Sequence, residues 1–183
     1  ESTSKRIAYA PSFGTSEWEY TLEQENRCRK LIELFDGVSV REEQGVQMCF
    51  EHFGIRAQHV LDPTLLLPAS HYFSFVTRKK SAELIYNFLD YDKQKKEIVL
   101  RVSDTLKMKA MPLLKMGDKE KNTKERIAPS IEDWLSGIYN SEYMIVDSFH
   151  ATVFCIIFHK RFITVGNDAR GLSRFTSLLN MFL

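Results

Sequence analysis

The segment Asp147-Ser148-Phe149-His150 places an acid, a hydroxyl and an imidazole within four positions, between two apolar runs. The run before it, residues 143–146, predicts a buried strand, and the run after it predicts a helix. In open α/β sheets, ligands bind at the carboxyl ends of the strands, where the next helix begins. The amides at the start of that helix favour anions. A histidine in that first turn titrates near neutral pH and can therefore donate or accept a proton.

A purely structural interpretation of the same segment stays open. Asp147 or Ser148 would then cap the following helix, and His150 would be a core histidine whose hydrogen bonds are satisfied. The segment is not a nucleophile elbow, because the glycines of the GxSxG pattern do not flank Ser148. Spacing alone does not separate the catalytic interpretation from the structural one.

Two further predicted strand ends carry polar residues. Arg41 and Glu42 directly follow the short strand 38–40, and Asp62-Pro63 follows a strand predicted at residues 57–61. The guanidinium of Arg41 suits a carboxylate or a phosphate, although a single arginine is more often a surface charge. Asp62 could equally cap a turn. Three polar strand ends in one chain are harder to dismiss than one.

Strands and helices alternate along the chain, which predicts an α/β fold with helices on both faces of a parallel sheet. Residues 65–80 lack a clear period and contain Pro68, so we expect a crossover or linker between two such units. Ser130 is predicted to cap a helix. The predicted strands are 6–10, 38–40, 57–61, 83–89, 108–113, 143–146 and 162–165, and the helices are 22–35, 43–53, 93–105, 130–139, 149–158 and 172–182.

Composition excludes several classes of protein. The 25 basic and 24 acidic residues give a net charge of +1, so no global field points to nucleic acid. The longest apolar stretch, residues 151–158, is too short to span a bilayer. Residues 115–128 form a locally basic polar segment that we expect to be a solvated loop.

The cysteines and histidines predict neither a disulfide framework nor a metal site. Cys28, Cys49 and Cys155 are odd in number and form no CxxC pair, which favours reduced, buried thiols in a cytosolic protein. The remaining histidines are widely spaced and lack a paired acid motif.

Several segments together carry a family resemblance. They are "IAYAPSFG", "VSVREEQGV", "VLDPTLLL", "WLSGIYNSEYMIVDSFHATVFCIIFHKRFITV" and "GLSRFTSLL". In this order they resemble the polysaccharide pyruvyl transferase family over nearly the whole chain. The resemblance implies two Rossmann-like domains facing each other in a glycosyltransferase-B-like arrangement. Residues 1–75 would be the later part of the first domain and residues 76–183 the second. The family segment that precedes "IAYAPSFG" is missing, so we expect a fragment of a longer chain.

The resemblance also implies an activity. A pyruvyl group would pass from phosphoenolpyruvate to a sugar of a surface polysaccharide or its precursor, leaving a cyclic ketal and free phosphate. Phosphoenolpyruvate is the donor substrate, and no further cofactor is expected. The acceptor sugar would be lipid-linked or nucleotide-linked, and the enzyme would work in the cytoplasm or at the inner face of the membrane.

The resemblance assigns roles to particular residues. His150 matches the catalytic histidine, and Arg41 matches an arginine that binds the acidic groups of the donor. Arg174 is an anion-binding candidate that could equally be a surface charge. The other expected substrate-binding residues are Glu42, Ser12 and Ser148.

One position departs from the family pattern. Better-known members carry an arginine where this chain has Ser148, in an "RLH"-like triplet that reads "SFH" here. Either another base, such as Arg174 or Lys160, compensates for the lost cation, or the donor differs. A glycosyltransferase that uses a nucleotide-sugar and a non-catalytic sugar-binding module are therefore the competing hypotheses.

Overall fold

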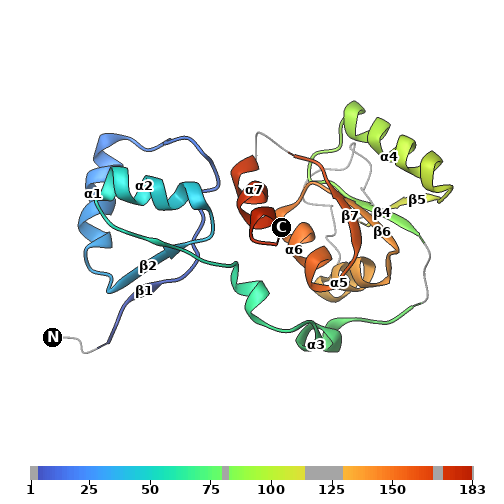
Figure 1. Ribbon diagram of the computed structural model, residues 1–183, viewed down its shortest axis with the longest axis horizontal. Helices are drawn as coiled ribbons and strands as arrows, with labels where there is room; N and C mark the ends of the chain where they lie inside the picture. The colour runs from blue at the N-terminus through green and yellow to red at the C-terminus, as the bar shows by residue number, and fades with distance from the viewer. Residues whose placement is uncertain (1–3, 80–82, 114–129, 167–170, 183) are drawn as a thin grey trace. The chain divides into compact units, whose positions relative to one another are not determined.

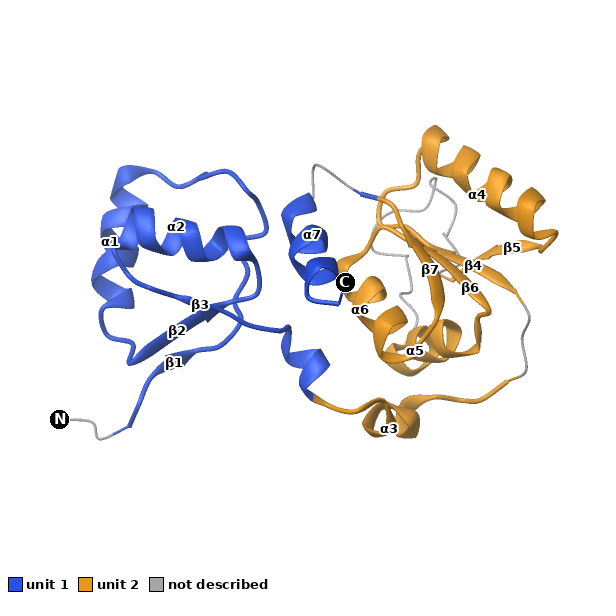
Figure 2. Cartoon of the chain, viewed as in Figure 1, with its two compact units in different colours: residues 1–66, 166–183 blue, residues 67–165 orange. Residues whose placement is uncertain are grey.

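The chain forms two compact units. A computed structural model describes residues 4–79, 83–113, 130–166 and 171–182 (Figure 1). One unit consists of Glu1–Leu66 with Gly166–Leu183, and the other of Leu67–Val165 (Figure 2). Residues 166–183 thus group with the first unit, whereas the sequence analysis assigned them to the second domain. The division into two Rossmann-like domains and their glycosyltransferase-B-like arrangement stay predictions. The polar segment 115–128 lies outside the described residues.

The first unit contains a three-stranded parallel sheet in the order β1-β2-β3. Its core lies between the sheet and α2, where Val40, Cys49 and Ala57 are buried. A Cβ on Gly45 would come within 3.2 Å of Val40, so glycine lets this helix pack closely on β2. The elements of this unit are β1 (Ile7–Ala8), α1 (Leu22–Ile32), β2 (Gly37–Val40), α2 (Glu43–Phe53), β3 (Gln58–His59), the 3₁₀ turn η1 (Pro63–Leu66) and α7 (Leu172–Asn180).

The helix boundaries of the first unit follow from their caps. Thr21 begins α1 with a reciprocal capping box to Gln24. Gly54 ends α2 in the left-handed conformation, at a φ of 71°, which glycine adopts without strain. Both helices therefore start at the residue that the sequence predicted, and α2 also ends there.

The second unit contains a four-stranded parallel sheet in the order β5-β4-β6-β7. Leu84, Val99 and Ile145 lie in its core, and α6 is buried along most of its length. The elements are α3 (Ala69–Tyr72), the 3₁₀ turn η2 (Phe73–Phe75), β4 (Leu84–Asn87), α4 (Lys93–Leu106), β5 (Ala110–Pro112), α5 (Ile131–Asn140), β6 (Tyr143–Val146), α6 (Phe149–Ile157) and β7 (Arg161–Thr164).

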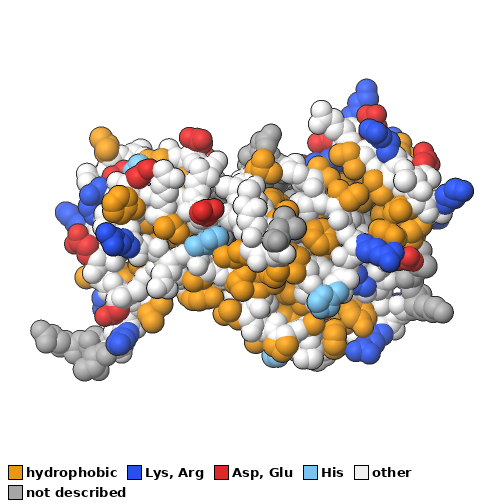
Figure 3. Space-filling view, in the orientation of Figure 1, with side chains coloured by type: hydrophobic (Ala, Val, Ile, Leu, Met, Phe, Trp, Pro, Cys, Tyr) orange, Lys and Arg blue, Asp and Glu red, His pale blue; other side chains and the backbone are white. Residues whose placement is uncertain are grey.

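The predicted α/β class with parallel sheets is confirmed. Ser130 caps α5 as predicted, because its hydroxyl accepts from the Asp133 amide at 3.0 Å. In the second unit, Figure 3 shows charged side chains of both signs over α4, as its lysine-rich sequence implies. None of the helices in the described ranges has the length and apolar character needed to cross a membrane.

One prediction about the cysteines was wrong. Cys49 and Cys155 are buried, but Cys28 is exposed. Cys28 lies on α1, which buries none of its residues completely. Cys28 lies between Arg27 and Arg29, so a helical context in the sequence did not mean burial for this thiol.

Candidate active site

His150 lies on the surface, in the first turn of α6 and just beyond the carboxyl end of β6. Its imidazole meets the Phe149 ring edge-to-face, with the ring centroids 5.4 Å apart. The interpretation of His150 as a core histidine is therefore wrong. Ser148 occupies the N-cap position, but its side chain makes no capping hydrogen bond. The first amides of α6 are thus not capped by Ser148, which leaves the helix start suited to an anion.

Asp147 does not cap α6 either, because it forms a buried ion pair with Lys95. The Lys95 Nζ lies 2.6 Å from Asp147 Oδ2, and the Leu89 amide donates to Oδ1 at 2.7 Å. Lys95 Nζ also donates to the Asp90 carbonyl at 2.6 Å and lies 5.7 Å from the centre of the Phe88 ring. The pair therefore ties the loop between β4 and α4 to the junction from which α6 starts.

Lys95 was not among the residues predicted from the sequence, because it lies within the charged run "KQKKE". The usable signal is helical spacing. Lys95 precedes the buried Val99 by four residues, so both side chains lie on the same face of α4. A lysine on the buried face of a helix needs an acidic partner, and Asp147 is that partner.

Lys160 cannot replace the missing cation beside His150. Lys160 directly precedes β7 and donates to the Ser141 carbonyl at 2.9 Å, and burial lowers the pKa of its ammonium. Because β6 and β7 run parallel, Lys160 lies at the amino edge of the sheet, whereas His150 follows the carboxyl edge. This part of the expectation was wrong, and Arg174 remains the candidate.

In the first unit, Arg41 and Asp62 form an ion pair where β2 and β3 end. Arg41 Nη1 donates to Asp62 Oδ2 at 2.7 Å. Asp62 Oδ1 accepts from both the amide and the hydroxyl of Thr64, at 3.0 and 2.7 Å. The side chain of Arg41 is 18% exposed and that of Asp62 is 2% exposed. Arg41 is therefore more than an isolated surface charge, and Asp62 does more than cap its turn.

Ser12 and Glu42 meet at the same edge of this sheet. The Ser12 hydroxyl donates to Glu42 Oε1 and accepts from the Gly14 amide at 3.1 Å. Glu42 is buried, and within the described part of the chain its Oε2 has no hydrogen-bond partner. A buried carboxylate oxygen without a donor is costly, so it favours a ligand group that can donate.

Arg174 belongs to the same unit as Ser12, Arg41 and Glu42. It lies half-buried in the first turn of α7, which Gly171 precedes at a φ of 78°. A Cβ on Gly171 would overlap the Gly14 carbonyl oxygen and come within 3.3 Å of Arg174 Nε. Glycine is therefore required for α7 to begin against the loop that follows Ser12.

The two strand edges provide different chemistry. The first unit presents a guanidinium, a buried carboxylate and a hydroxyl, and the second presents an exposed imidazole at a helix start. Within the described ranges, no three histidine, cysteine or acidic side chains gather in a way that could hold a metal ion.

Comparison with known proteins decides the family. The family model described as "Polysaccharide pyruvyl transferase" matches residues 2–169. The chain belongs to the polysaccharide pyruvyl transferase family. Membership of this family means that the protein is an enzyme of the transferase class. The family indicates a polysaccharide as the acceptor. No curated protein and no solved structure matches the chain significantly.

Proposed function

We propose that this enzyme transfers the pyruvyl group of phosphoenolpyruvate to two hydroxyls of a sugar, forming a cyclic ketal. The observation that carries the proposal, beside the family match, is the exposed His150 at the start of α6. An accessible titratable group at the start of a helix whose N-cap side chain makes no capping hydrogen bond suits proton transfer to an anionic donor.

The reaction requires three proton movements and one leaving group. Protonation of the vinyl carbon of phosphoenolpyruvate makes C2 electrophilic, and the first sugar hydroxyl adds to C2 and loses its proton. The C2–O bond to phosphate then breaks, and phosphate leaves with the bonding electrons. The second hydroxyl attacks C2 and releases a proton, which closes the ketal. A general acid/base serves these proton movements, and His150 takes this role.

Arg41 binds the acidic groups of the donor in this proposal. Its planar guanidinium matches a carboxylate or phosphate through two parallel hydrogen bonds, and Asp62 fixes its orientation through Nη1. Arg174 supplies a second positive charge in the same unit and compensates for Ser148. Ser148 donates to an oxyanion of the donor, and Ser12 and Glu42 contact substrate at the edge where they already bond to each other.

The location of the reaction follows from the donor. Phosphoenolpyruvate is a glycolytic metabolite, so the transfer takes place in the cytoplasm or at the inner face of the membrane. The acceptor sugar is then lipid-linked or nucleotide-linked, before its export in a surface polysaccharide.

The test is phosphate release from phosphoenolpyruvate by the full chain, offered a panel of hexose acceptors. We expect release that depends on the acceptor and is lost in His150→Ala. Release of a nucleoside diphosphate from a nucleotide-sugar, with no phosphate released from phosphoenolpyruvate, would overturn the proposed donor and favour a glycosyltransferase.

A further inference from the structure

A polar groove lies between α2 and α7 in the first unit. Its volume is about 490 Å³, which falls within the range of about 300–1,000 Å³ for small-molecule sites. The two helices are joined beside it, because the Glu43 amide donates to the Ser177 hydroxyl at 3.1 Å. The groove is lined by Ser16, Glu43, Gln44, Gln47, Leu172, Ser173, Thr176 and Ser177.

The lining is polar but carries no positive charge. It provides four hydroxyls, two side-chain amides and one carboxylate, with no lysine or arginine among the described lining residues. Hydroxyls and amides both donate and accept hydrogen bonds, so they match the hydroxyls of a sugar. The carboxylate of Glu43 would repel the carboxylate and phosphate of the donor. The chemistry of the groove therefore favours a neutral, hydroxyl-rich ligand over an anionic one.

One lining hydroxyl is left without a bond. The Ser173 Oγ is buried from water, and the described residues offer it no hydrogen-bond partner. A buried hydroxyl of this kind favours a ligand that supplies the missing hydrogen bond.

Residues that line the groove are neighbours, in the chain, of the residues proposed to bind the donor. Glu43 follows Arg41 and Glu42 in the chain and begins α2. On the other wall, Ser173 immediately precedes Arg174. The groove and the two arginines therefore involve the same two helix starts, those of α2 and α7.

We infer that this groove binds the neutral sugar of the acceptor. The inference rests on the proposed function for the name of its ligand, but the binding it describes can be measured without turnover. Gln44 and Thr176 are exposed on opposite walls, and each can offer a hydrogen bond to a sugar hydroxyl.

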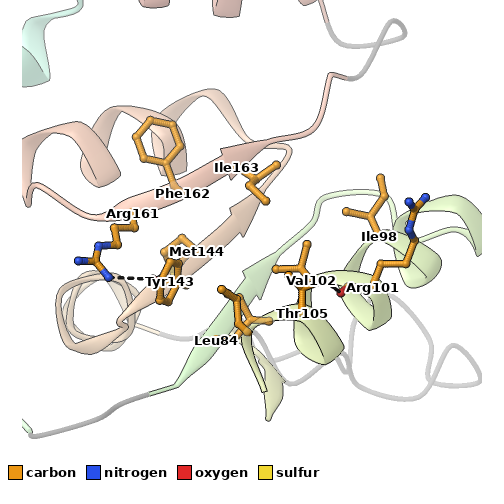
Figure 4. Close-up of a pocket in the computed structure, with 11 residues that line it drawn as sticks. Leu84, Ile98, Arg101, Val102, Thr105, Tyr143, Met144, Arg161, Phe162 and Ile163 are labelled. Carbon is orange, nitrogen blue, oxygen red and sulfur yellow. Dashed lines mark hydrogen bonds between the residues drawn. The ribbon is translucent and has the colours of Figure 1, made fainter. Parts of the chain in front are cut away.

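A large pocket in the second unit does not suit a sugar. Figure 4 shows this pocket of about 520 Å³ in the second unit, with Leu84 and Tyr143 at the amino ends of their strands. Most of its lining is apolar, including Ile98, Val102 and Ile163. It lies at the edge of the sheet opposite His150, so it neither offers sugar hydroxyls enough partners nor places them near the imidazole.

The test measures saccharide binding by saturation-transfer NMR and titration, with the full chain and no donor. The probes are the methyl glycosides of glucose, galactose, mannose and N-acetylglucosamine, together with methyl glucuronide. The groove variant is Gln44→Leu with Thr176→Val, which removes hydrogen-bonding groups and keeps side-chain size.

A matched control exists on α4. Gln94 and Gln44 are both exposed at the second position of a helix. Thr105 and Thr176 both bond to the carbonyl four residues before, at 2.8 and 3.5 Å. Gln94→Leu with Thr105→Val therefore makes the same chemical changes away from the groove.

We expect at least one neutral glycoside to bind, with an affinity about tenfold weaker in the groove variant and unchanged in the control. Methyl glucuronide should bind more weakly than methyl glucoside, because Glu43 repels it. Unchanged binding in the groove variant, tighter binding of the glucuronide, or no binding of any neutral glycoside would overturn the inference. If a glycoside binds in the groove but phosphoenolpyruvate yields no phosphate with it, the proposed function fails and the binding site stands.

Discussion

Each unit has an aspartate that follows a strand and binds a basic side chain, but the two ion pairs differ in access to solvent. The side chains of Lys95 and Asp147 are 7% and 0% exposed, and those of Arg41 and Asp62 are 18% and 2% exposed. The Lys95 ammonium is enclosed by a carboxylate, a carbonyl and an aromatic ring. The side chain of Arg41 is more exposed than that of Lys95. The closed pair holds a loop in place, whereas the open pair can also meet a ligand.

The strongest test of this difference is to remove Lys95. We expect Lys95→Met to lower the free energy of unfolding by about 3–5 kcal/mol, because it leaves the Asp147 carboxylate buried without its cation. Urea denaturation measures the change, and Lys96→Met on the exposed face of α4 is the control. Equal effects of the two substitutions would show that the pair does not hold the second unit together.

The second test separates stability from chemistry at the same strand end. We expect His150→Ala to lower turnover at least about 100-fold, as the loss of a general acid/base commonly does. Because His150 is exposed, the free energy of unfolding should change by no more than about 0.5 kcal/mol. Phosphate release and urea denaturation measure the two quantities, and His71→Ala, another exposed histidine of the same unit, is the control. Full turnover in His150→Ala would remove the imidazole from the mechanism.

The third test concerns the open pair. We expect Arg41→Lys to raise the KM for phosphoenolpyruvate about tenfold, because lysine keeps the charge but cannot make two parallel hydrogen bonds. Because lysine keeps the positive charge beside the buried Asp62, the substitution should cost less stability than Lys95→Met. Arg56→Lys, at an exposed position of the same unit, is the matched control. An unaltered KM, or a loss of stability as large as that of Lys95→Met, would give Arg41 a structural role like that of Lys95.

The sequence predicted the elements well where a local signal marks their ends. The bounds of α2 and β6 agree with the prediction, because a glycine C-cap and a short apolar run define them. β1 is shorter than predicted, because only Ile7 and Ala8 pair with β2 and Ala10 turns to a φ of 53°. Pairing with a neighbouring strand sets that limit, and the strand's own residues do not encode it.

The candidate site was predictable only in part. The polar residues at the strand ends could be listed from the sequence, but their partners could not. Arg41 binds Asp62, which lies 21 residues away in the chain, and Glu42 binds Ser12, which lies 30 residues away. The local sequence is compatible with Asp147 as a helix cap. It does not indicate that Asp147 pairs with a lysine 52 residues earlier. Distant pairs of this kind depend on sheet order, which periodicity does not give.

The last prediction concerns the rate at which a reagent modifies each thiol, which reports how well the surrounding unit protects that thiol. Burial raises the pKa of the Cys155 thiol to about 12, and it also raises the pKa of Cys49, whereas Cys28 is exposed. A thiol reacts as its thiolate, so at pH 8 a disulfide reagent such as Ellman's should modify Cys28 quickly. The same reagent should modify the buried thiols of Cys49 and Cys155 only after unfolding. Cys155 lies on α6, the helix that carries His150, so its protection reports directly on the packing behind the candidate catalytic residue. Cys28→Ser should abolish the fast phase. Rapid reaction of Cys155 in the folded protein would mean that α6 opens readily, and the closed character assigned to the second unit would then be wrong.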